Sequence, residues 1–190
     1  MTAFEHISAL LSFVYALALT HLLSRAGELI IARKRVTFSG LTTLGMVNAG
    51  LLVVFNWIDI WNLRSVAAWD IASISIQLAL VTSIYLACVL ISPKPSEEGL
   101  LDMESFFWKQ RIYFYAALVS VLVLSMLANL DFLKSADVGR FLQENSYTLI
   151  FFVPTVAALV FSSRAVQWLA GLGFAAGCIG FAIVFDASLR

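Results

Sequence analysis

The sequence predicts an all-α bundle of about six transmembrane helices, and three observations lead to this prediction. Hydrophobic residues make up 61% of the chain and charged residues only 13%, about half of the charged share typical of a soluble domain. The apolar residues form blocks of about twenty, the length that an α-helix needs to cross the hydrocarbon core. The charged residues lie almost entirely between these blocks. Only helices satisfy their own backbone hydrogen bonds in lipid over such lengths.

The apolar blocks define six expected spans within a single integral membrane domain, residues 1–190. No lysine or arginine precedes the first block, so we interpret it as a retained helix rather than as a signal peptide. The third span ends at Pro93-Lys94-Pro95, because proline cannot donate a helical hydrogen bond. The expected spans are 4–24, 42–63, 68–92, 111–131, 147–163 and 165–185.

The segment 96–110 is expected to be a short interfacial helix leading into the fourth span. Ser96 is a typical N-cap residue and is followed by two acids, which favour a helix N-terminus. Leu100, Met103 and Phe107 then form a partial apolar stripe at helical spacing. We expect this stripe to face the membrane surface. An alternative is that it docks a partner protein.

The distribution of basic residues predicts the orientation of the bundle. With the N-terminus outside, the inner loops hold eight basic residues and the outer segments four, which is the asymmetry of the positive-inside rule. Both termini are therefore expected to be extracytoplasmic, in a multi-pass protein of a bacterial inner (plasma) membrane. The inner set is Arg25, Arg33, Lys34, Arg35, Lys94, Lys109, Arg111 and Arg164, and the outer set is Arg64, Lys134, Arg140 and Arg190.

Acidic and amide side chains gather at the outer ends of the expected spans. Polar groups at membrane depth are costly, and they tend to face cavities or one another. One interpretation is an outward-open polar vestibule that attracts a cation or a small polar solute. The other is that these groups mark helix ends and form hydrogen bonds between helices. The candidate contacts for a solute or ion are Asp59, Asp70, Asn62, Gln77, Glu5 and His6.

Several functional classes lack support in the sequence. No nucleophile elbow, phosphate-binding loop, redox motif or zinc-protease motif is present, so we predict no enzymatic activity, no catalytic residue and no cofactor. No residue spacing requires metal ligands to converge, and we expect no metal site. The net charge of zero argues against a nucleic-acid partner.

The last expected span carries glycines at spacings that allow two helices to approach closely. We expect Gly173, Gly177 and Gly180 to pack against another helix, and we predict a homo-oligomer in the lipid bilayer, most simply a dimer. Two functions remain open. The first is a channel or transporter for a cation or small polar solute. The second is a non-catalytic membrane subunit or scaffold that binds partner proteins.

Overall fold

The computed structural model describes residues 2–66, 69–95, 99–133 and 138–189, and they are almost entirely helical. The elements are α1 (Ala3–Ile31), η1 (Arg33–Arg35), β1 (Val36–Thr37), α2 (Gly40–Asp59), η2 (Ile60–Ser65), α3 (Ile71–Ile91), β2 (Leu101–Asp102), α4 (Met103–Leu133), α5 (Val138–Glu144), α6 (Ser146–Val160) and α7 (Arg164–Leu189). The predicted all-α class is confirmed.

Five of the described helices are long and apolar enough to cross a membrane: α1, α2 with its η2 extension, α3, α4 and α7. The expected fifth span corresponds to α6, a shorter apolar helix. Its 15 residues cover about 22 Å, less than the roughly 30 Å of a hydrocarbon core. The short helix α5 directly precedes α6 along the chain.

The helix ends follow from local chemistry. Thr2 caps α1 in a reciprocal capping box with Glu5, and Asp70 caps α3 by accepting from the backbone N–H of Ser73. These contacts satisfy N–H groups that have no partner within the helix. The last helical residue of α3 is Ile91, two positions before Pro93, as the proline predicts.

The start of α4 differs from the expected interfacial helix. Residues 96–98, where that helix was predicted to begin, lie outside the described residues, and Leu101–Asp102 is the strand β2, which pairs in parallel with β1. Residues 103–110 are the first turns of α4, which continues to Leu133. The reason is local, because Met103–Leu133 contains neither proline nor glycine and nothing separates a surface helix from the span.

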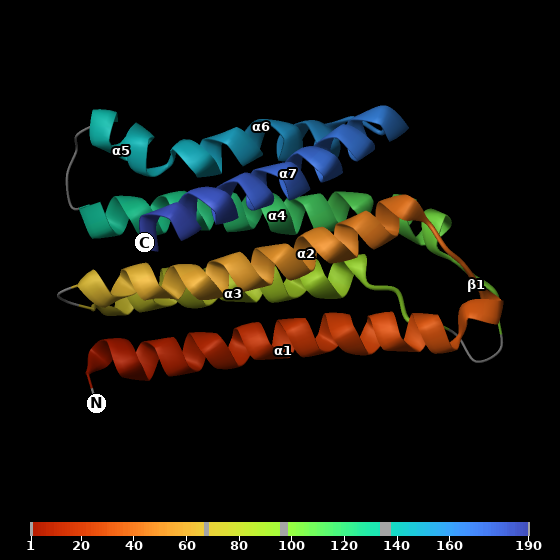
Figure 1. The fold of residues 1–190 in the computed structure, drawn as a ribbon, viewed down its shortest axis with the longest axis horizontal. Helices are drawn as coiled ribbons and strands as arrows, with labels where there is room; N and C mark the ends of the chain where they lie inside the picture. The colour runs from red at the N-terminus through yellow and green to blue at the C-terminus, as the bar shows by residue number, and fades with distance from the viewer. Residues whose placement is uncertain (1, 67–68, 96–98, 134–137, 190) are drawn as a thin grey trace.

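The helices run roughly side by side in an elongated bundle (Figure 1). Helix α3 packs against α1, α2 and α4, whereas α7 packs against α2 and α6. The start of α1, the α2–α3 connection and the end of α7 lie at one end, here called the N-terminal end (Figure 1). Strands β1 and β2 lie at the opposite end, here called the strand end. The chain therefore begins and finishes at the same end of the bundle.

The bundle has an apolar surface and several polar groups inside it. Large side chains such as Phe13, Val153 and Leu169 are 62%, 72% and 72% exposed, which suits a surface that faces lipid rather than water. The buried polar or charged residues are Ser39, Thr42, Asn48, Ser73, Gln77, Ser92, Arg111, Asn145, Thr155 and Gln167. This distribution fits a membrane-embedded protein.

Of the three glycines expected at a helix contact, only Gly177 lies at one among the described residues, and Gly171 is a further close contact. A Cβ atom at Gly171 would lie 2.7 Å from Leu44 Cδ2, and one at Gly177 would lie 2.5 Å from Phe151 Cε1. Gly177 thus packs on α6 of its own chain. In contrast, a Cβ at Gly173 or Gly180 would meet no atom within 4 Å among the described residues.

Replacing Gly45 with leucine should weaken the contact between α2 and α3. A Cβ there would lie 2.7 Å from Ile91 Cδ1, so a larger side chain must displace Ile91 in the core. We expect a loss of about 1–3 kcal/mol in the free energy of unfolding, measured by denaturant titration in detergent. Gly50→Leu is the matched control on the same helix, because no other helix among the described residues places an atom within 4 Å of its Cβ position. Equal losses in the two variants would contradict this account of the packing.

Candidate functional site

Asp59 and Asn62 form a hydrogen-bonded pair near the N-terminal end of the bundle. The side-chain amide of Asn62 donates to Asp59 Oδ1 at 2.6 Å, and both residues are exposed. Asp59 lies within the candidate membrane span Gly40–Arg64. Among the described residues no basic side chain forms an ion pair with Asp59. Within the part of the chain that the structure describes, it is therefore a carboxylate without an ionic partner on an apolar helix.

Asp70 and Gln77 occupy different environments on α3. Asp70 is exposed and accepts from both the backbone N–H and the hydroxyl of Ser73, at 2.8 and 2.9 Å. Its carboxylate therefore has a structural task as the helix cap. Gln77 is buried, 8% exposed. Asp70 is thus exposed at the start of α3, whereas Gln77 is buried two turns further along the helix.

Glu5 and His6 are exposed in the first turns of α1. Glu5 Oε2 accepts from the backbone N–H of Thr2 at 2.8 Å. Glu5 also lines a cavity of about 540 Å³ at this end of the bundle. Its other walls are Thr2, Ala3, Phe4, Trp61, Arg64, Val66 and Trp69. The cavity therefore brings together groups of α1, η2 and the connection between α2 and α3.

A buried arginine holds the end of α6. Arg111, on α4, is only 6% exposed. Its Nη1 donates to the carbonyl oxygens of Ala158, Leu159 and Phe161 at 2.6, 3.0 and 3.0 Å, and its Nη2 donates to the hydroxyl of Ser162 at 3.0 Å. The last carbonyls of a helix have no intrahelical donor and carry partial negative charge. The guanidinium supplies both the donors and the opposite charge.

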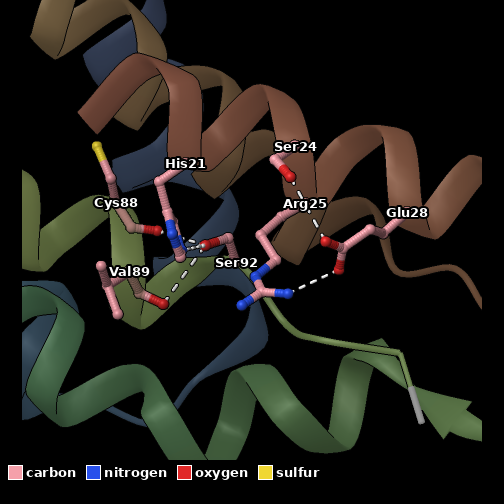
Figure 2. Close-up of polar contacts among 7 residues, drawn as sticks. All are labelled: His21, Ser24, Arg25, Glu28, Cys88, Val89 and Ser92. Carbon is pink, nitrogen blue, oxygen red and sulfur yellow. Dashed lines mark hydrogen bonds and ion pairs between the residues drawn. The ribbon is translucent and has the colours of Figure 1, made fainter. Parts of the chain in front are cut away.

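His21 joins α1 to the end of α3 through Ser92 (Figure 2). The Ser92 hydroxyl donates to the carbonyl of Cys88 at 2.6 Å, so its hydrogen is already used. His21 Nε2, 3.1 Å from Ser92 Oγ, must therefore carry the proton and donate. One turn further along α1, Arg25 pairs with Glu28 at 2.6 Å. This cluster ties two helices together toward the strand end.

A second polar region lies between α2, α4, α6 and α7. Asn48 Nδ2 donates to the carbonyl of Gly171 at 2.8 Å. Gln167 Nε2 donates to the carbonyls of Ala158 and Phe161 at 2.9 and 2.8 Å. Both amide side chains line one small cavity, and within the described part of the chain neither amide oxygen has a donor.

The sequence interpretation missed the residues of this second region as site candidates. Gln167 lies in the first turn of α7 and was not considered in the sequence, whereas Arg111 was counted only as one of the inner basic residues. The available signal was the helical face of α2, because Asn48 and Asp59 differ by only about 20° at 100° per residue. The two polar residues therefore share one helical face, but the helix that covers Asn48 could not be chosen from the sequence.

A search of the described residues found no group of three or more His, Cys, Asp or Glu side chains that could hold a metal ion. Comparison of the chain with protein-family models, with curated proteins and with solved structures found no match.

Proposed function

We propose that this chain is a membrane channel or transporter for a cation or a small polar solute. The observation that carries the proposal is Asp59, a carboxylate within a candidate membrane span and without an ionic partner among the described residues. Ionisable groups at such positions are costly and are typical of ion or substrate pathways. Asn62 orients the carboxylate through its hydrogen bond.

The cavity at the N-terminal end supports an entrance there. Its volume of about 540 Å³ falls within the range of small-molecule sites. Its walls combine a carboxylate, a guanidinium and indole rings, and Arg64 stacks on Trp61 with its Cζ 5.4 Å from the ring centroid. A polar solute would thus meet hydrogen-bonding groups before it reaches the apolar helices.

Flux through liposomes that contain only the purified protein tests this proposal. We expect uptake of a monovalent cation or of a small neutral solute above the level of protein-free vesicles. Potassium, sodium, ammonium and glycerol are suitable first probes, because they sample charge and hydrogen bonding separately. Correctly folded protein that passes none of the four would contradict transport of this class.

The second candidate function is a non-catalytic subunit or scaffold. One observation favours it, because Gly173 and Gly180 leave open space on α7, where a helix of a second copy or of a partner could approach closely. The 96–110 segment remains a further proposed contact for a partner protein. Co-purification of one stable partner, together with no flux in liposomes, would favour this function over transport.

Reporter fusions test the proposed orientation of the bundle. Because the basic residues are concentrated in the loops after the first and third spans, the positive-inside rule places those loops in the cytoplasm. We expect cytoplasmic signals from fusions after residues 35 and 96, and periplasmic signals after residues 66 and 138. A periplasmic signal at 35 or 96 would overturn the orientation.

A further inference from the structure

A small cavity lies among α2, α4, α6 and α7. The volume that the centres of water molecules can occupy in it is about 30 Å³. About 10–15 Å³ of such space is enough for one water. The cavity therefore has room for two or three waters. Its walls are mainly apolar, and the polar side chains among them include Asn48, Thr155 and Gln167.

Two buried amides contribute the acceptors of this cavity. Asn48 is 7% exposed and Gln167 is 1% exposed. Their nitrogens donate to backbone carbonyls, which can only accept, so neither amide can be flipped without losing these bonds. Each amide oxygen is thereby fixed as an acceptor, and no described group donates to either one.

A buried acceptor without a donor is unfavourable, and the neighbouring hydroxyl of Thr155 does not relieve it. That hydroxyl donates to the carbonyl of Phe151 at 2.7 Å. What the two amide oxygens require is a small ligand with two hydrogens to donate.

We propose that this cavity is a binding site for a water molecule that donates to both Asn48 Oδ1 and Gln167 Oε1. Water supplies two hydrogens, fits the volume and carries no charge. The charge matters because Arg111 and Gln167 donate to the same carbonyl oxygen of Ala158, which places a guanidinium beside the site. A sodium or ammonium ion would be repelled there, so a neutral ligand is favoured. The bound water links α2 to α7.

The direct test is an experimental structure of the full chain at a resolution that shows ordered water, determined once in sodium chloride and once in ammonium chloride. We expect the same density in both salts, within hydrogen-bond distance of the two amide oxygens. An empty cavity would overturn the proposal. Density that appears in only one of the two salts would also overturn it, because the ligand would then be the ion.

Unfolding of single and double variants gives an independent test. Asn48→Leu or Gln167→Met removes one of the two acceptors and releases the water. The second substitution therefore no longer removes the stabilisation that the bound water provides. We expect the double variant to lower the Tm by less than the sum of the single changes. Asn48→Leu combined with Asn145→Leu is the matched control, because Asn145 pairs with Asn129 elsewhere, and its effects should add. Additive effects in the Asn48–Gln167 pair would overturn the link. If Asn48→Leu does not fold, the density test alone decides.

Discussion

Replacing Arg111 with methionine is expected to destabilise the protein by at least about 3 kcal/mol. Each hydrogen bond from a charged donor contributes about 1.5–3 kcal/mol. At the end of α6, Arg111 Nη1 shares its two hydrogens among three carbonyls and Nη2 donates to one hydroxyl. Gln167 still donates to the carbonyls of Ala158 and Phe161, so the loss falls mainly on Leu159 and Ser162. Methionine keeps much of the volume, which leaves hydrogen bonding and charge as the main change.

The measurement is the free energy of unfolding in detergent, with two comparison variants. Arg111→Lys keeps the charge but loses the planar fork, and we expect an intermediate loss. Arg164→Met is the matched control, because its side chain is 65% exposed and pairs with Glu104 at 3.2 Å. Such an exposed pair contributes about 0–1 kcal/mol. A loss at Arg111 no larger than that at Arg164 would show that the end of α6 does not depend on the guanidinium.

Replacing Asp59 with asparagine is expected to reduce flux in liposomes at least tenfold, which corresponds to about 1.4 kcal/mol at the rate-limiting barrier. The substitution preserves size and hydrogen-bonding capacity, including an acceptor for Asn62, but removes the charge. Thermal stability in detergent should therefore stay nearly unchanged. Flux for each variant is compared at equal amounts of folded, reconstituted protein.

Asp102→Asn is the control for this experiment. Asp102 is also an exposed acid, but it lies in β2 at the strand end and accepts from the backbone N–H of Glu104, a task that asparagine can perform. We expect wild-type flux from it. If Asp59→Asn instead lowers the Tm, and flux changes only with the amount of folded protein, Asp59 has a structural role. Wild-type stability and wild-type flux would remove it from both accounts.

The secondary structure was predictable because its causes are local. Apolar blocks of about twenty residues, the proline at position 93 and the capping Asp70 act within a few residues along the chain, and each confines a helix whatever surrounds it. The helices nevertheless extend beyond the expected spans at two places, because α1 continues to Ile31 rather than residue 24 and α4 begins at Met103 rather than residue 111. The segment before the fourth span differs from the expected interfacial helix, because Leu101 and Asp102 pair with β1 and an uninterrupted helical run begins at Met103.

The candidate site was less predictable because burial depends on which helices meet. In the sequence Arg111 is an ordinary charge at the border of a span, and Gln167 is a polar residue near a helix start. Only the packing of α4 and α7 against α6 encloses both and directs them to the same carbonyl oxygens. The sequence by itself determined the helices and their apolar surface, since hydrophobic length acts locally. The tertiary structure decided which polar groups lie inside, because a residue on a helical face is buried only where another helix packs on that face.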